Sequence, residues 1–451
     1  MKTKFACARR TAILLIGVIG LGAACDRPEG ARESATDSTR TASSASADVQ
    51  LKFPEGFTAT VFADNLGGAR HLVASPNGNI YVNTWRSPYD TTRQVPPGGF
   101  VVGLRDTDRD GKADLIKRFG TTSESGSGGG TGIALRDGAL YVESDSTIMR
   151  YVIPPDSLVP ILKPEVIVNG LTTEGGHPMH PIAVDARNLF VNIGSATNSC
   201  QVKDRQPESP GHRPCRELET RAGIWRFETT AGQRFSPTKR YATGIRNAVG
   251  LAINPRDQRL YATQHGRDQL AENWPKLYNW KQSANLPAEE LLRIQQGGDY
   301  GWPYCYYDST ATGGLLLAPE YGGDGMKRGD CARKLRPVAT YPAHWAPNAL
   351  VFFDVPKTMP DSYRGGVFIA FHGSWNRAPE PQDGYNVVFQ PMANGKASGP
   401  YQVFADGFAG ARKEPGLAAH RPSGLAVGPD GALYISDDQR GWVWRVTYTG
   451  K

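Results

Sequence analysis

The chain has 451 residues, with 51 Lys and Arg, 44 Asp and Glu, and a formal charge of +7. Four of the basic residues lie in the first 24 positions, which hold no acidic residue, so the rest of the chain carries about +3. No basic run or basic helix occurs, which excludes the charged surface typical of nucleic-acid-binding proteins. Glycine (52) and proline (33) are abundant and long helical periodicity is scarce, which indicates a turn-rich all-β chain.

Residues 1–24 have the order of a secretory signal peptide. A basic region at residues 2–10 precedes an apolar stretch at residues 11–21, and small residues then lead to Cys25. This small-residue run resembles a bacterial lipobox, in which Cys25 is lipidated after cleavage. We therefore expect an exported protein on the periplasmic side of a bacterial membrane, attached to that membrane only through a lipid anchor. The alternative is plain signal cleavage near Ala24.

Residues 25–50 are rich in small and polar side chains. From position 26 on they contain no aromatic residue and one valine, so they cannot bury a hydrophobic core. We predict a disordered tether here, followed by a single folded domain at residues 51–451.

A short hairpin-like phrase recurs six times in the predicted domain. Each copy has two runs of alternating apolar residues joined by a polar turn of Asn-Gly, Asp-Gly or Pro-Asp type, the pattern of a β-hairpin. The copies begin at His71, Gly132, Pro181, Gly250, Ala349 and Gly424. Because one hairpin cannot bury its own faces, the repeat predicts a six-bladed β-propeller, an all-β fold, here with long inter-strand insertions.

Four cysteines lie outside the leader, an even number in a chain expected to be exported. Three pairings are possible, and we expect the local one, with disulfides Cys200–Cys215 and Cys305–Cys331, each of which closes an insertion. No Cys-x-x-Cys-His motif for haem attachment occurs, so electrons from any redox reaction must leave to a separate carrier.

Seven of the eight histidines lie at or next to a repeated strand. Since the corresponding ends of propeller strands meet at one face, we expect these side chains to converge on one central funnel. They are His71, His177, His180, His265, His344, His372 and His420. A single histidine in such a place is usually structural, but seven at corresponding positions indicate a functional site.

Three polar strings near the fourth repeat carry further candidate residues. Arg246 offers a planar fork for a carboxylate or quinone oxygen, and Asn247 is placed to orient it. The turn around Gln264, His265 and Gly266 offers backbone carbonyls for a hard cation. The alternative is that Arg246 only pairs with a neighbouring acid.

These strings also carry a family resemblance. Arg246-Asn-x-x-Gly-Leu251, Gln264-x-Gly266 and Gly297-Gly-Asp-Tyr-Gly-Trp-Pro303, in this order, resemble the glucose/sorbosone dehydrogenase family. The resemblance covers roughly residues 51–447. It is closest to the L-sorbosone dehydrogenase type, through Trp85-Arg-Ser-Pro-Tyr-Asp90, His344-Trp-Ala-Pro-Asn348 and His372-Gly-Ser-Trp-Asn-Arg377.

The resemblance implies a six-bladed propeller that binds pyrroloquinoline quinone (PQQ) and Ca²⁺ over its central channel. It implies oxidation of an aldose or sugar aldehyde by hydride transfer to the quinone, with a separate cytochrome or quinone as electron acceptor. His177 matches the catalytic base, and Arg246 matches a residue that contacts the reacting quinone oxygen. The residues implied for cofactor binding are Arg246, Asn247, Gln264, Trp345, Arg377 and Arg421. The carbonyls of His265 and Gly266 fall where the family holds calcium.

The chain departs from the family pattern at three places. Ser195 stands where the glucose enzyme has an aspartate that orients the base, and a serine stabilises a charged imidazole less well. Arg377 matches a family lysine only loosely, and Ala419 replaces a second arginine near Arg421. These changes bear on the substrate and on the cofactor.

Two other functions are compatible with the sequence. A calcium-dependent propeller lactonase predicts Glu, Asp and Asn side-chain ligands at the funnel mouth. A non-catalytic binding platform predicts that His177, Arg246 and His372 do not converge.

The acidic loop Asp106–Asp114 has the spacing of a calcium loop but has Lys117 at the twelfth position. Its flanks read as strands, so we expect a hairpin turn, with a second Ca²⁺ site as the alternative.

Overall fold

The computed structural model describes residues 49–85, 97–120, 128–310 and 314–450. The predicted leader, Cys25 and nearly all of the tether lie outside the described residues. Among the helices that the structure describes, none has the length and apolar character needed to cross a membrane.

Six sheets form the blades, each built around four antiparallel strands. Named from the innermost strand outward, the first three blades are β2 (Ala69–Ala74), β3 (Ile80–Thr84), β4 (Val101–Arg105), β5 (Leu115–Phe119); β6 (Ile133–Arg136), β7 (Ala139–Ser144), β8 (Thr147–Val152), β9 (Glu165–Asn169); and β10 (Ile182–Val184), β11 (Asn188–Ile193), β12 (Gly223–Glu228), β14 (Arg240–Thr243). The last three are β15 (Leu251–Ile253), β16 (Leu260–Gln264), β17 (Glu289–Ile294), β21 (Ala339–Tyr341); β22 (Pro347–Phe352), β23 (Val367–Phe371), β24 (Asn386–Gln390), β27 (Gln402–Ala405); and β28 (Pro422–Val427), β29 (Leu433–Asp437), β30 (Trp442–Tyr448), β1 (Phe57–Ala63). Short strands β13 (Gln233–Arg234) and β18 (Gly298–Asp299) extend the second and third blades.

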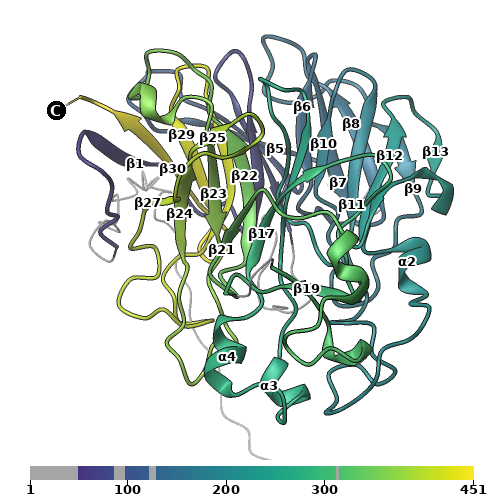
Figure 1. Cartoon of the computed structure of the whole chain (residues 1–451). Coiled ribbons are helices and arrows are strands. Elements are labelled where there is room, and N and C mark those ends of the chain that lie inside the picture. The colour runs from purple at the N-terminus through teal and green to yellow at the C-terminus, as the bar shows by residue number, and fades with distance from the viewer. Residues whose placement is uncertain (1–48, 86–96, 121–127, 311–313, 451) are drawn as a thin grey trace, which may run out of the picture. The chain divides into compact units, whose positions relative to one another are not determined.

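The first strand of the domain closes the ring. β1 pairs antiparallel with β30, so the last blade joins both ends of the folded chain, as Figure 1 shows with the purple strand beside the yellow ones. The six innermost strands also contact one another in sequence around the ring, from β2 through β6, β10, β15 and β22 to β28 and back to β2. The six-bladed all-β propeller predicted from the repeat is therefore confirmed, and each repeat is the inner hairpin of one blade.

The core lies between neighbouring blades rather than at one centre. Strand β23 is buried at all five positions because both faces of its sheet pack against adjacent blades. Phe368, Phe389 and Phe404 of the fifth blade pack with Trp444 and Phe57 of the sixth. This interdigitation explains why a buried strand such as β23 reads as a continuous apolar run.

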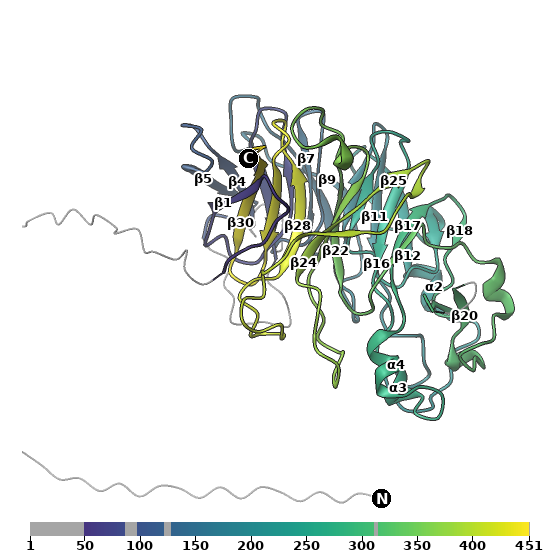
Figure 2. The same ribbon diagram turned by 60° about the vertical axis from the view of Figure 1, so that its left-hand side comes forward.

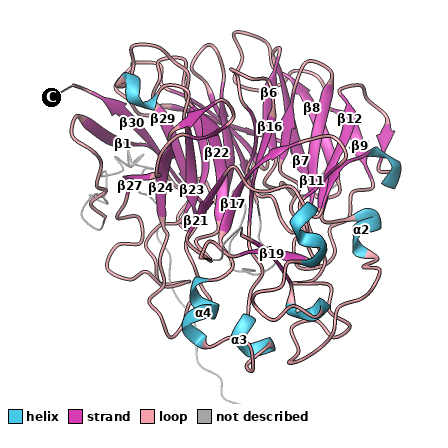
Figure 3. Ribbon diagram, viewed as in Figure 1, coloured by secondary structure: helices cyan, strands magenta, loops and turns pink. Residues whose placement is uncertain are grey.

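The long insertions gather beyond one end of the blades. Helices α2 (Glu217–Thr220), α3 (Leu270–Asn273) and α4 (Trp280–Asn285) lie there with the hairpin of β19 (Cys305–Tyr307) and β20 (Leu315–Leu317), as Figures 1 and 2 show. In Figure 3 helices α3 and α4 lie below the main mass of strands, and α2 lies at its lower right-hand edge. Single 3₁₀ turns occur at Pro237–Lys239, Pro319–Tyr321, Gly329–Arg333 and Asp361–Tyr363, and β25 (Met392–Ala393) pairs with β26 (Lys396–Ala397).

Both predicted disulfides are confirmed. Cys200–Cys215 and Cys305–Cys331 have Cα–Cα distances of 6.2 and 5.8 Å, and each closes a loop in the insertions.

The acidic loop Asp106–Asp114 connects β4 to β5, so the predicted hairpin turn is also confirmed. Asp106 accepts hydrogen bonds from the backbone of Arg109 and Gly111, at 2.6 and 2.9 Å. The loop therefore holds its own shape through Asx-type bonds.

Candidate active site

A cavity of about 820 Å³ opens at one end of the propeller. Its wall is formed mostly by residues that come just before an innermost strand or just after the second strand of a blade, as the sequence predicted. The chemistry-bearing members are Arg70, His177, Arg205, Arg246, Asn247, His265, Asp268, Glu289, His344, His372, Asn376, Arg421 and Asp438. Side chains from five of the six blades thus meet in one space.

His177 presents a neutral imidazole to this cavity. Its Nδ1 lies 2.8 Å from the backbone carbonyl of Ser195 and 3.1 Å from the Ser195 hydroxyl, which itself donates to the carbonyl of Thr197. Because a carbonyl only accepts, Nδ1 carries the proton and Nε2 carries the lone pair. Burial, and then the nearby charge of Arg246, holds the pKa of His177 well below its usual range. The side chain is therefore unprotonated at Nε2 at neutral pH, as a proton acceptor must be.

Gly194 permits the close approach of His177 to Asn247. A Cβ at position 194 would lie 2.5 Å from the Cβ of His177 and 3.1 Å from Oδ1 of Asn247. No side chain fits in that space, so glycine at this position is a geometric requirement of the site.

Arg246 is held rigidly at the cavity wall. Its Nη2 forms a 3.0 Å ion pair with Asp268, and Nη1 donates to the carbonyl of Gly266 at 2.8 Å. Nε and Nη2 also donate to the backbone and side-chain oxygens of Asn198, at 3.1 and 3.0 Å. Burial alone would raise the pKa of Asp268, but Arg246 and Arg205 hold that pKa far below its usual range. The guanidinium is thus fixed in one orientation beside His177.

A second charged group lies at the ends of the first, fifth and sixth blades. Asp438 forms an ion pair with Arg70 at 2.7 Å and a hydrogen bond with His372 at 2.8 Å. Burial, and then Arg421, lowers the pKa of His372 to about 4, so His372 donates to Asp438 as a neutral ring. The Arg421 guanidinium donates to the carbonyls of His372 and Gly373, both at 2.9 Å, and the Arg421 backbone N–H donates to Asp437 at 2.7 Å. Among the described residues, no carboxylate hydrogen-bonds to the guanidinium itself.

Comparison with known proteins identifies the family. A family model described as TrAA12-like matches residues 51–449. The chain belongs to the TrAA12-like family. An uncharacterized protein of Borreliella burgdorferi is 26% identical over 88% of this chain and 91% of its own. A pyrroloquinoline quinone-dependent sugar dehydrogenase of Hypocrea jecorina is 24% identical over 54% of this chain and 57% of its own.

Solved structures show the same fold for this TrAA12-like protein. The calcium structure of a Trichoderma reesei carbohydrate-active enzyme of family AA12 has a TM-score of 0.70, with 17% identity over 89% of this chain and 98% of that one. The holo form of the PQQ domain of a Coprinopsis cinerea pyranose dehydrogenase has a TM-score of 0.69, with 19% identity over 88% and 97%. The chain therefore has the fold of the PQQ-dependent sugar dehydrogenases, and the expected family is confirmed at that level.

The TrAA12-like cavity gathers four of the seven predicted histidines, namely His177, His265, His344 and His372. The predicted convergence was wrong for the other three, because each is used inside the fold. Nδ1 of His180 pairs with Glu143 at 3.0 Å and that of His420 with Asp437 at 2.9 Å, and Nε2 of His71 donates to the Asn348 carbonyl at 2.7 Å.

Three predicted cofactor-binding residues lie off the cavity wall, in contrast to Asn247 and Arg421. Gln264 lies behind Arg246, where its Oε1 accepts from the Arg246 backbone at 2.7 Å and its Nε2 donates to Glu290. Trp345 packs edge-on against Phe371 within the fifth blade.

Arg377 is the third of these residues. It donates to the carbonyls of Ala284, Ala343 and Pro381, so it ties helix α4 to the loop after β23. Its guanidinium makes these hydrogen bonds within the protein and does not line the cavity where a ligand would bind.

Of the two carbonyls predicted to bind calcium, that of Gly266 already accepts a hydrogen bond. The Gly266 carbonyl accepts from the Arg246 guanidinium, so a cation there would lie beside a fixed positive charge. Burial, and then Arg246, lowers the pKa of His265 to about 3, and its Nε2 donates to the Pro347 carbonyl at 3.2 Å. These residues shape the wall through their own hydrogen bonds.

Sequence reasoning missed several wall residues. Asp268 lies two residues after Gly266, and Asp438 directly follows the second strand of the sixth blade. The position of both residues relative to the repeat was therefore the available signal. Glu289 lies in an ordinary strand and gave no signal. It accepts from the backbone of Gly266 at 2.9 Å and of Ala346 at 3.2 Å, yet burial raises its pKa to about 8.

Proposed function

We propose that this protein is a PQQ-dependent dehydrogenase that oxidises an aldose or a related sugar aldehyde. One observation carries the proposal: a neutral histidine, with Nε2 as its free acceptor, shares a cavity wall with a fixed guanidinium. Support also comes from the Hypocrea jecorina relative and from the pyranose dehydrogenase fold. The sorbosone-type motifs His344–Asn348 and His372–Arg377 favour an aldehyde of that kind as the substrate.

The wall residues fit a flat polyanionic cofactor. Oδ1 of Asn247 is buried without a hydrogen-bond partner among the described residues and so awaits a donor. Four arginines face three acidic residues on the described wall, and the guanidinium of Arg421 hydrogen-bonds to backbone carbonyls rather than to a carboxylate. Arg246, Asn247 and Arg421 would hold PQQ, whose carboxylates match planar guanidinium groups. When bound, PQQ supplies the two-electron acceptor that protein side chains lack.

The protein's own residues supply the proton chemistry. Nε2 of His177 takes the proton of the sugar hydroxyl, because Nδ1 is committed to the Ser195 carbonyl. Arg246, held in place by Asp268, would supply a fixed positive charge to stabilise negative charge that develops on the bound acceptor. Burial of both groups strengthens these interactions relative to water.

The other two functions are less well supported. The lactonase predicts Glu, Asp and Asn side-chain ligands at the mouth, but Asp268 and Asp438 are each bound by an arginine and burial raises the pKa of Glu289 to about 8. The binding platform predicts that His177, Arg246 and His372 lie apart, and all three line one cavity. We also propose export, with Cys25 as the lipid-bearing residue, and transfer of the electrons to a separate cytochrome or quinone.

Reconstitution tests the proposed function. Calorimetric titration of the full chain with PQQ should show binding, and the loaded protein should reduce an artificial electron-accepting dye when given aldoses or sugar aldehydes. As a matched pair, Arg421→Met should weaken PQQ binding, whereas Arg377→Met should leave the affinity unchanged. The absence of both PQQ binding and dye reduction with every sugar would overturn the proposal.

A further inference from the structure

The base His177 has no carboxylate at Nδ1, and a backbone carbonyl orients it instead. The position of that carbonyl, and so the orientation of the imidazole, depends on the contacts that hold the loop of residues 195–200. This loop serves both proposed catalytic groups. Ser195 holds His177, and the backbone and side-chain oxygens of Asn198 receive hydrogen bonds from Arg246. The backbone N–H of Ser195 also donates to the Arg246 carbonyl at 2.8 Å.

Glu217, the first residue of α2, accepts hydrogen bonds from this loop. One carboxylate oxygen accepts from the backbone of Ala196 at 2.6 Å and of Thr197 at 3.3 Å. The other accepts from the Thr197 hydroxyl. Glu217 thus receives three donors from two consecutive residues directly after Ser195. These bonds fix the peptide that follows the orienting carbonyl.

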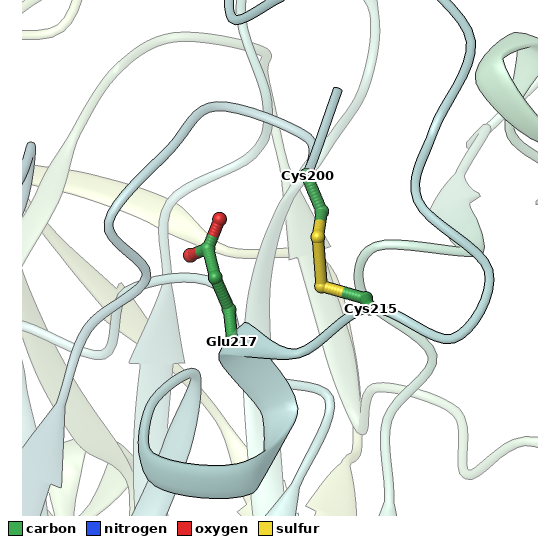
Figure 4. Close-up of side chains that lie close together, drawn as sticks. All are labelled: Cys200, Cys215 and Glu217. Atoms are coloured by element: carbon green, nitrogen blue, oxygen red, sulfur yellow. A yellow bond between two sulfur atoms is a disulfide. The ribbon is translucent and has the colours of Figure 1, made fainter. Parts of the chain in front are cut away.

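The disulfide Cys200–Cys215 joins the same two segments covalently. Cys200 ends the loop, and Cys215 lies two residues before Glu217, so the bond fixes the start of α2 against the loop. Figure 4 shows Glu217 rising from the start of the helix beside the disulfide. Both cysteines are buried, with Ala222 and Trp302 packed around them. Trp302 in turn donates from Nε1 to the Asn198 carbonyl at 3.0 Å.

We propose that Glu217, held in place by the Cys200–Cys215 disulfide, is the positioning residue that orients the base His177 and the guanidinium of Arg246. The catalytic role of Glu217 rests on the proposed function. The contacts that hold the loop do not depend on it. Glu217 acts through the loop and touches neither substrate nor cofactor. In this chain a carboxylate acts on the base through the peptide backbone, at the position where Ser195 replaces a direct acidic partner.

Glu217→Gln provides the sharpest test. The amide keeps one acceptor oxygen and carries no charge, so the bond to the Thr197 hydroxyl is either lost or reversed and the charge-assisted bonds to the loop are weakened. A misplacement of about 1 Å in a catalytic group costs on the order of 100-fold in rate, so we expect kcat to fall about 10- to 100-fold with KM nearly unchanged. Glu219→Gln on the same helix is the matched control, because that side chain is exposed and should leave both constants unchanged.

A second readout needs no cofactor. Nitrogen-15 NMR of labelled histidine in the PQQ-free full chain, with the His177 signal assigned from His177→Asn, reports its tautomer. The wild type should show protonated Nδ1 throughout, and Glu217→Gln should show a mixture of tautomers. The double variant Cys200→Ser/Cys215→Ser should shift the signal in the same direction, while Cys305→Ser/Cys331→Ser should not. Charged and titratable groups that act on His177 are Arg246, His265 and Asp268, and these variants retain them all.

The outcomes separate the two proposals. An unchanged His177 signal in folded Glu217→Gln would overturn the positioning role, whatever the activity. A wild type that oxidises no sugar, but whose His177 signal responds as expected, would overturn the proposed function and leave the positioning role supported. If the cysteine variant does not fold, Glu217→Gln alone decides, with melting temperature as the check on its integrity.

Discussion

Replacing Ser195 by aspartate should move the acid limb of the pH–rate profile. The Ser195 hydroxyl lies 3.1 Å from Nδ1 of His177, so an aspartate there would place a negative charge in contact with the ring. An opposite charge at such a distance raises a histidine pKa by about 1 to 3 units, and each unit corresponds to about 1.4 kcal/mol of preference for the charged form.

The direction follows from the role of a base, which acts only when unprotonated. In the wild type, burial and then Arg246 keep the pKa of His177 well below 6.5, so kcat/KM should stay flat from pH 8 to below pH 6. In Ser195→Asp the activity should be lost at a pH about 1 to 3 units higher as the solution is acidified. The assay is dye-linked kcat/KM against pH on the PQQ-loaded enzymes.

Ser195→Asn is the matched control, because it has nearly the same shape without the charge. Its acid limb should stay with that of the wild type. The reasoning is refuted if Ser195→Asp and Ser195→Asn have the same acid limb, or if the wild-type limb already lies at pH 6.5 or above.

Three further predictions concern the cavity wall. Asp268→Asn should lower the free energy of unfolding by about 3 kcal/mol in chemical denaturation, because Arg246 loses its buried counter-charge; a loss under 1 kcal/mol would contradict this. Gly194→Ala should displace His177 and lower kcat at least about tenfold, since the added Cβ lies 2.5 Å from that side chain; activity within twofold of the wild type would show that the site adapts. Arg421→Met should weaken PQQ binding by about tenfold or more in calorimetry, because a charge-assisted donor is removed, and an unchanged affinity would place the cofactor elsewhere.

The sequence predicted the architecture well because the repeat is a local signal. Alternating apolar residues and turn residues define each hairpin, and the same hairpin six times leaves few ways to bury the faces. The repeat also located the site, since Arg246 and Arg421 precede inner strands and His265 follows a second strand. Disulfide pairing followed from sequence distance, because each pair spans a single insertion.

The sequence could not show which polar groups hydrogen-bond inside the fold and which are left for a ligand. Arg377 and His180 have the residue types of a site, but tertiary neighbours satisfy them inside the fold. The sequence indicated that the Gly266 carbonyl could bind a cation, but in the fold it accepts a hydrogen bond from Arg246. Glu289 belongs to β17, whose sequence reads as an ordinary strand. Its place on the cavity wall becomes visible only when the fourth and fifth blades pack together. Such pairings depend on contacts between segments far apart in sequence.

Single-turnover reduction of bound PQQ tests the central claim most directly. Absorbance of the quinone is followed after a sugar or sugar aldehyde is mixed with the PQQ-loaded wild type, with His177→Asn, and with His212→Asn as an exposed control. The wild type and His212→Asn should reduce the quinone at the same rate, and His177→Asn should bind PQQ equally well but reduce it at least about 100-fold more slowly. Equal rates in wild type and His177→Asn would contradict the assignment of this cavity and its base.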